Sequence, residues 1–289
     1  MAQEIGRIAV SACLAVFFAS ALFFSTVVFV TSQQNGIIGQ AAFSFGIIAN
    51  VLAFGAIALR KAKRFTAAMT ALYMLFLFLS AVTKYFPSVV LHLMMLTFPV
   101  AWLVYAGKTS PDRVWAELRL HKRNLLLLAA LGAFATIFVL YPLIIGQGIL
   151  LKLAGIDDAG KVSQTILDAP IWLAAFSFLF APISEEIFFR SFLYGRLRKL
   201  AGKILPGKAA LAFAALATTA LFAVAHYSYG SVAQILGAFT IGLIFMGVFI
   251  LTDSLAAVIA AHAVFNFISV CIIYLADYFG AEVPVGLLF

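Results

Sequence analysis

Charged residues are scarce in this chain, since Asp, Glu, Lys and Arg together make up 10% of its 289 residues. Soluble domains carry roughly 25%. Hydrophobic residues reach 65% and aromatic residues 15%, which is more apolar surface than a water-soluble globule of this size can hide. The composition excludes a soluble enzyme, a disordered tail and a collagenous scaffold, and it indicates that lipid solvates most of the chain.

Cysteine is nearly absent as well, with 2 residues in the whole chain. Cys13 and Cys271 each stand alone in an apolar stretch, so the sequence offers neither a disulfide framework nor the CxxC spacing of a zinc or redox site. The formal net charge of +8 would fit nucleic-acid binding. In a membrane protein, however, such an excess is typical of cytoplasmic loops that face anionic lipid, and we expect no nucleic-acid partner.

Long apolar runs make up most of the chain. A transmembrane helix needs about 20 predominantly apolar residues, and nine runs of this kind are separated by charged or polar segments. The sequence therefore predicts an all-α fold, a polytopic transmembrane helix bundle of about nine spans. The predicted spans are residues 8–30, 37–59, 65–82, 87–106, 124–145, 171–194, 209–227, 232–251 and 254–276.

The Lys and Arg residues indicate the orientation of the bundle. If the N-terminus lies inside, the cytoplasmic segments hold 16 of these residues and the outer segments three. The positive-inside rule then predicts a cytoplasmic N-terminus and a multi-pass protein of the plasma membrane. Between the fourth and fifth spans, Ser110-Pro111-Asp112 has the pattern of an N-cap and a first helical turn. It predicts a short interfacial helix, with a solvated loop as the alternative.

Polar side chains inside the predicted spans are concentrated in the last third of the chain. An ionisable group at the middle of a bilayer costs roughly 3 kcal/mol or more, so such groups are functional candidates. Before residue 165, His92 is the only histidine or charged residue well inside a span. The later candidates are Glu185, Glu186, Arg190, His226, His262 and Asn266.

The spacing of these residues indicates different tasks. Glu186 and Arg190 are four positions apart, so they share one helix face and can neutralise each other. Glu185 is turned about 100° away on an α-helix, which leaves it as the carboxylate free to act as a general base. The alternative is that both glutamates only pair with basic residues and hold helices together. Ser184, just after Pro182, is predicted to be an N-cap that restarts the helix after a proline break.

A second pair, His262 and Asn266, is also separated by four positions and shares a helix face. An imidazole and an amide side by side suit the stabilisation of an oxyanion or the binding of a water molecule. The alternative is that each side chain only makes hydrogen bonds between helices.

Three motifs together resemble the CPBP intramembrane proteases, a family that includes CAAX prenyl endopeptidases and bacteriocin-processing membrane proteins. They are Glu185-Glu186-xxx-Arg190, Phe222-xxx-His226 and His262-xxx-Asn266, in the family's order. The resemblance covers about residues 165–275, within a predicted transmembrane region 124–289. The preceding region, 1–123, is predicted to hold N-terminal transmembrane helices with basic cytoplasmic loops.

The resemblance implies hydrolysis of peptide bonds inside the membrane. Glu185 would activate a water molecule, His226 would help to position or deprotonate it, and His262 and Asn266 would stabilise the oxyanion. Glu186 and Arg190 would support these residues.

Zinc is a possible cofactor of such a site, held by Glu185, His226 and His262. The HExxH pattern that places two ligands and a base on one helix is absent from the sequence, and Glu185 as a ligand leaves no separate base. We therefore favour a metal-free glutamate mechanism without a cofactor.

The expected partners are a peptide or membrane-protein substrate and the lipid bilayer. CAAX-type processing and peptide or bacteriocin processing all fit the same residues. Two other functions stay open, namely a membrane transporter that uses the polar pocket for ions and a noncatalytic membrane scaffold that retains it for binding.

Overall fold

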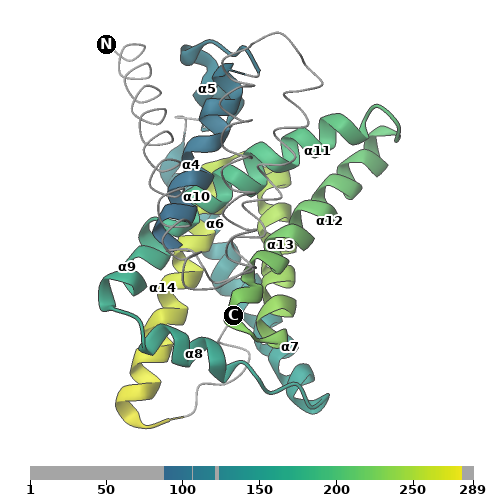
Figure 1. The fold of residues 1–289 in the computed structure, drawn as a ribbon. Helices are drawn as coiled ribbons and strands as arrows, with labels where there is room; N and C mark the ends of the chain where they lie inside the picture. Colours follow the sequence, from purple (N-terminus) through teal and green to yellow (C-terminus); the bar gives the residue numbers. More distant parts are fainter. Residues whose placement is uncertain (1–87, 106, 121–123, 282–289) are drawn as a thin grey trace, which may run out of the picture. The chain divides into compact units, whose positions relative to one another are not determined.

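The computed structural model describes residues 88–105, 107–120 and 124–281 (Figure 1). All the regular structure in these ranges is helical, as the sequence predicted. The first three predicted spans and the N-terminus lie outside the described residues, so the total of nine spans and the orientation stay predictions.

The chain divides into two compact units, with the boundary between Glu117 and Leu118. In the described part of the first unit, α4 (Ser88–Tyr105) covers the predicted fourth span and contains the apolar stretch Met94–Val104. A short helix, α5 (Pro111–Glu117), follows. It begins at the proline of Ser110-Pro111-Asp112, which confirms the predicted helix start.

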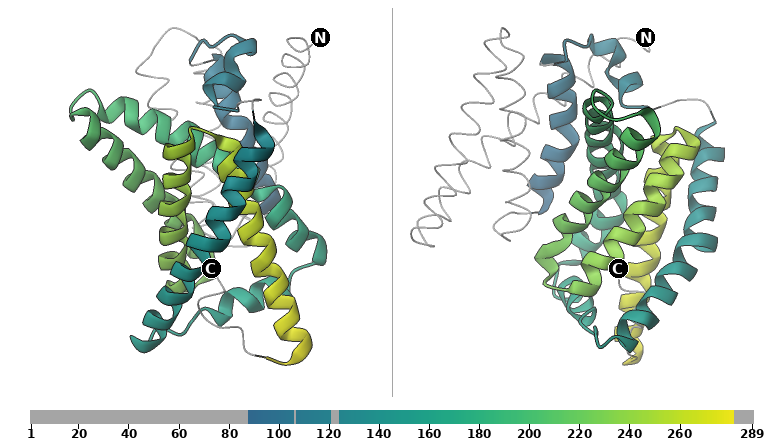
Figure 2. Two further views of the ribbon diagram at one scale, coloured as in Figure 1. Left: turned by 180° about the vertical axis from the view of Figure 1, so that it is seen from behind. Right: turned by 90° about the vertical axis from the view of Figure 1, so that its right-hand side faces the viewer.

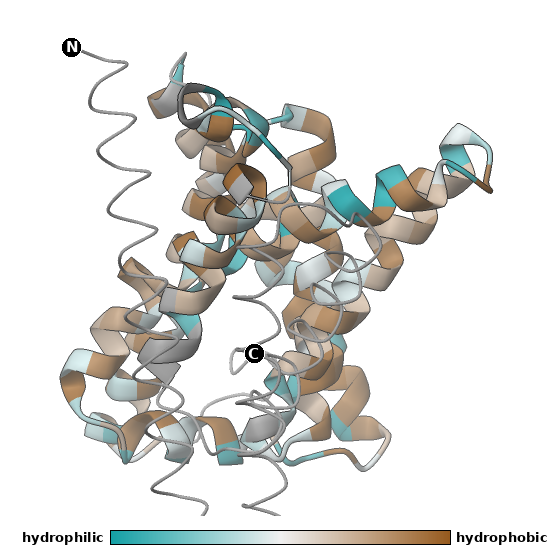
Figure 3. Ribbon diagram, turned by 45° about the horizontal axis from the view of Figure 1, so that its top comes forward, coloured by the Kyte–Doolittle hydropathy of each residue, from teal (hydrophilic) through white to brown (hydrophobic). Residues whose placement is uncertain are grey.

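The second unit contains five helices that are long and apolar enough to cross a membrane, and each overlaps one predicted span. They are Leu126–Leu153, Ile171–Ala201, Gly207–Ala225, Val232–Thr252 and Leu255–Phe279. Side chains such as Leu126, which is 89% exposed, cover their outer surface, as expected for contact with lipid. Figure 3 shows these helices as mainly hydrophobic ribbons.

Several of these spans are built from consecutive helical segments. The first contains α6 (Leu125–Ala135), the π-helix η1 (Thr136–Leu140) and α7 (Tyr141–Leu153). The second contains α9 (Ile171–Leu179), α10 (Ala181–Glu186), the π-helix η2 (Ile187–Leu193) and α11 (Tyr194–Ala201). The remaining helices of the second unit are α8 (Gly160–Leu167), α12 (Gly207–Ala225), the 3-10 helix η3 (His226–Tyr229), α13 (Val232–Thr252) and α14 (Leu255–Phe279).

The helix break in the second of these spans lies at Phe180, between α9 and α10. Pro182 sits in the first turn of α10, where its missing N–H leaves no helical hydrogen bond unmade. Ser184 lies inside α10 and its hydroxyl donates to the carbonyl of Ala181 at 2.9 Å. The prediction that Ser184 is the N-cap is therefore wrong, because the proline restarts the helix two residues before it.

The helices α6 and α14 cross at very close range and run side by side in Figures 1 and 2. A Cβ atom at Gly132 would lie 2.0 Å from the carbonyl oxygen of Ala257, so only glycine fits there. One turn later, the Thr136 hydroxyl donates to the carbonyl of Ala261 at 2.9 Å. Small residues and hydroxyl bonds of this kind bring transmembrane helices together, and here they fix the position of α14.

Candidate active site

Three charged or polar side chains form a buried cluster where α10, η2 and α14 meet. Arg190 Nη1 donates to Glu186 Oε1 at 3.0 Å, as the four-residue spacing predicted. His262 Nδ1 donates to the same oxygen at 2.7 Å. All three residues are buried. Because burial removes water from these charges, their mutual bonds replace the lost hydration, and Glu186 links α10 to α14.

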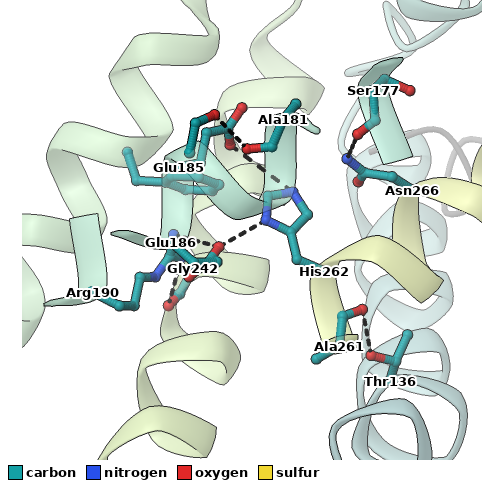
Figure 4. Close-up of polar contacts among 12 residues, drawn as sticks. Thr136, Ser177, Ala181, Glu185, Glu186, Arg190, Gly242, Ala261, His262 and Asn266 are labelled. Carbon is teal, nitrogen blue, oxygen red and sulfur yellow. Dashed lines mark hydrogen bonds and ion pairs between the residues drawn. The ribbon is translucent and has the colours of Figure 1, made fainter. Parts of the chain in front are cut away.

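Glu185 faces the other nitrogen of the His262 ring (Figure 4). Its Oε2 is 4.0 Å from His262 Nε2, and its side chain is 13% exposed, whereas that of Glu186 is fully buried. The expectation that Glu185 stands apart from the Glu186–Arg190 pair is confirmed. The expectation that it is free needs correction, because one imidazole faces both carboxylates, each through a different nitrogen.

The guanidinium of Arg190 is enclosed by aromatic rings and backbone. It lies 4.2 Å from the ring centroid of Phe222 and 5.7 Å from that of Phe245. Its Nη2 donates to the carbonyl of Gly242 at 3.5 Å. A Cβ at Gly242 would approach Thr219, Phe222 and Arg190 at 2.9 to 3.4 Å. Sequence reasoning missed Gly242 and Phe245, since their part in the site depends on the packing of α13.

His226 occupies the first position of η3, directly after α12. Its Nδ1 lies 2.8 Å from the carbonyl oxygen of Phe222, and because a carbonyl only accepts, Nδ1 carries the proton. The ring packs on Phe222 with centroids 4.8 Å apart and stacks with Tyr229 at 6.2 Å. Its Nε2 is therefore the nitrogen left for a water molecule or a substrate.

Phe222 contacts both histidines of the site. Its ring meets the edge of His262 at 6.1 Å between centroids and packs on His226. The same ring packs on Arg190. The Phe222-xxx-His226 spacing therefore places one aromatic ring in contact with Arg190 and with both imidazoles.

Asn266 lies one turn after His262 on α14, as predicted, but part of its amide is already engaged. Nδ2 donates to the carbonyl of Ser177, on α9, at 2.8 Å. An amide nitrogen carries two N–H bonds, so one of them is left for another acceptor.

The zinc alternative depends on which donor atoms the site brings together. Within residues 88–105, 107–120 and 124–281, no three His, Cys, Asp or Glu side chains are placed to hold a metal ion together. Each histidine has its Nδ1 bonded elsewhere, His262 to Glu186 and His226 to a backbone carbonyl, which leaves Nε2 as the nitrogen that each could offer to a metal. Because Glu185, His226 and His262 are not grouped closely enough to share one ion in this arrangement, we derive no metal-dependent step.

A comparison with protein families gives one match. Residues 167–268 match the family described as type II CAAX prenyl endopeptidase Rce1-like. The matched residues make up about a third of the chain, and this region is similar to the Rce1-like CAAX proteases. It includes all six predicted site residues. The match confirms the resemblance to CPBP intramembrane proteases, and together with the apolar helices it shows an integral membrane protein. Searches of curated proteins and of solved structures give no match.

Proposed function

We propose that this Rce1-like protein is an intramembrane endopeptidase in which Glu185 activates the attacking water. The observation that carries the proposal is the division between the two neighbouring glutamates. Glu186 is fully buried and bonds to Arg190 and His262 through Oε1, whereas Glu185 is the more exposed of the two and faces the other nitrogen of the imidazole. A general base must reach a water molecule, and the greater exposure of Glu185, 13% against 0% for Glu186, supports its assignment to this task.

The reaction needs two proton transfers. Glu185 takes a proton from water as the water oxygen attacks the peptide carbonyl, and His226 Nε2 orients that water. The proton then passes from Glu185 to the leaving nitrogen as the C–N bond breaks. The products are a carboxylic acid and an amine, so Glu185 returns to its starting state. The acid then gives its proton to the amine, which leaves a carboxylate and an ammonium group.

The oxyanion that forms during the attack needs hydrogen-bond donors. We assign this task to His262 Nε2 and to the remaining N–H of Asn266, which lie one turn apart on α14. Because His262 Nδ1 already donates to Glu186, His262 acts in this step as the imidazolium, which carries a proton on each nitrogen. The Glu186–Arg190 pair holds the imidazole in place through Nδ1. Removal of one preorganised donor of this kind lowers kcat by about 10²–10³-fold.

The substrate is a peptide or a membrane protein cleaved close to the bilayer, and a CAAX-type C-terminus is the first candidate because of the family match. The test is cleavage of a fluorogenic prenylated CAAX peptide and of a peptide library by the purified chain in lipid nanodiscs. We expect cleavage by the wild type and none by Glu185→Gln. The matched control is Glu117→Gln, which makes the same change at an exposed residue of α5 and should leave cleavage unchanged.

Equal turnover by the wild type and Glu185→Gln would contradict the proposal. A chelator should leave the rate unchanged, and a loss that added zinc restores would favour the metal alternative. If no peptide is cleaved but ions cross proteoliposomes, the transporter reading would replace the protease. Peptide binding without cleavage would favour the scaffold.

A further inference from the structure

The His226 loop, residues 226–231, contributes to the site from outside the long helical spans. It consists of η3 and the two residues that lead into α13. The other site residues lie within helical spans that cross the whole unit. A short turn has few contacts of its own, so its position depends on what is bonded to it.

Asp158, in the connection between α7 and α8, makes three hydrogen bonds to the end of this loop. Its Oδ1 accepts from the Ser231 hydroxyl at 2.9 Å and from the N–H of Ala233 at 3.0 Å. Its Oδ2 accepts from the N–H of Val232 at 2.7 Å. The first N–H groups of a helix have no partner within the helix, so Asp158 caps α13 from a segment more than 70 residues away.

Lys161, in the first turn of α8, bonds to the same loop. Its Nζ donates to the carbonyl of Gly230 at 3.0 Å and lies 3.8 Å from Asp158 Oδ2. Gly230 has φ 67, a left-handed conformation that favours glycine, and it ends η3. Asp158 and Lys161 therefore hold the His226 loop at two successive points, and we call this pair the clamp.

The charge state of the clamp is consistent with this geometry. Partial burial raises the pKa of Asp158, but the hydrogen bonds from Ala233, Val232 and Ser231, together with Lys161, lower it by more, and the net pKa lies below the usual value. At neutral pH the carboxylate is charged and accepts all three bonds.

The clamp also connects the two histidines. The helix α8 contacts η3, which carries His226, and α14, which carries His262. Figure 1 shows α8 passing between the lower part of α14 and the α7 end of the unit. Val162 is the buried residue on its inner face. Movement of α8 would therefore change the distance between the loop and α14.

We propose that Asp158 and Lys161 are positioning residues for peptide hydrolysis, which hold the His226 loop at the working distance from the Glu185–His262 side of the site. Both precede the region that matches the protease family, which starts at residue 167. The proposal rests on the proposed function. It makes the α7–α8 connection part of the catalytic apparatus rather than a passive link.

The experiment compares Asp158→Ala, Asp158→Asn and Lys161→Met with the control Asp157→Asn, which neutralises the exposed neighbouring carboxylate. We expect Asp158→Ala to lower kcat at least tenfold with KM changed by less than threefold, and to shift the pH profile of kcat. We expect Asp158→Asn and Lys161→Met to have smaller effects and Asp157→Asn to have none. Hydrogen exchange at residues 226–233 should accelerate in Asp158→Ala and not in Asp157→Asn.

The outcomes separate this proposal from the proposed function. Wild-type kcat, pH profile and exchange in Asp158→Ala would overturn the clamp, even if Glu185→Gln is inactive. A kcat loss equal to the loss of folded protein, with an unchanged pH profile, would also overturn it. If the wild type cleaves no peptide, the protease proposal is contradicted. The catalytic role of the clamp is then contradicted as well, whatever the hydrogen-exchange data show.

Discussion

The two histidines of the site are held in place by different means. His262 lies within α14, and its ring faces both Glu185 and Glu186, with Nδ1 bonded to Glu186. His226 lies on a 3-10 turn whose far end is bonded to Asp158 and Lys161. His262 is fixed by interactions with buried charged groups, which are strong where water is excluded. His226 is fixed by polar bonds nearer to water. Disturbing each in turn should therefore give different results.

The largest effect on stability is expected from Arg190→Met. Glu186 would keep its bond to His262 but lose its guanidinium partner in a fully buried position. Breaking a buried ion pair by removing one partner costs about 3–5 kcal/mol. Thermal unfolding in detergent should show this loss. In the surviving folded fraction, hydrogen exchange should increase more at 186–193 than at 226–233, and the reverse order would contradict the separation of the two supports.

A smaller effect is expected from Gly132→Ala, which disturbs the His262 side of the site by pushing α14 away from α6. The added Cβ would collide with the Ala257 carbonyl, and overpacking of this kind costs about 1–3 kcal/mol. Gly146→Ala is the matched control, since a Cβ there meets nothing within 4 Å. Thermal unfolding should be lowered by the first change only. Equal melting temperatures for the two variants would contradict the close approach of α6 and α14.

The sequence predicted the parts of the site that depend on local spacing. The Glu186–Arg190 pair and the positions of the last five spans follow from the periodicity of a helix and from apolar run length. Two of these helices extend well beyond their predicted ends at 145 and 194, to Leu153 and Ala201. The shared imidazole between Glu185 and Glu186 does not, because it joins residues 76 apart in the chain. The Asp158 bonds were missed for the same reason. Only Asp158 in a loop and Ser231 before an apolar run gave a weak signal of capping.

The smallest expected effect concerns the clamp at low pH. The pKa of Asp158 is lowered on folding, so its contribution is present above the unfolded-state value of about 3.9 and is lost as the pH falls through the lower folded value. The difference in melting temperature between the wild type and Asp158→Asn should be constant from pH 8 to pH 5. It should shrink only below about pH 4. A difference that already shrinks between pH 7 and pH 5 would show that another group controls the loop.

The central claim is that two adjacent carboxylates have separate tasks, one in chemistry and one in structure. The most direct measurement is single-turnover peptide cleavage, with thermal unfolding in parallel, for Glu185→Gln and Glu186→Gln. The account predicts that Glu185→Gln lowers the cleavage rate by at least about 10³-fold, which lies within the 10²–10⁴ typical of a general base. Its melting temperature should stay near that of the wild type. Glu186→Gln should lower the melting temperature and keep measurable cleavage in the folded fraction. Cleavage by Glu185→Gln at the wild-type rate, or an inactive but fully stable Glu186→Gln, would contradict it.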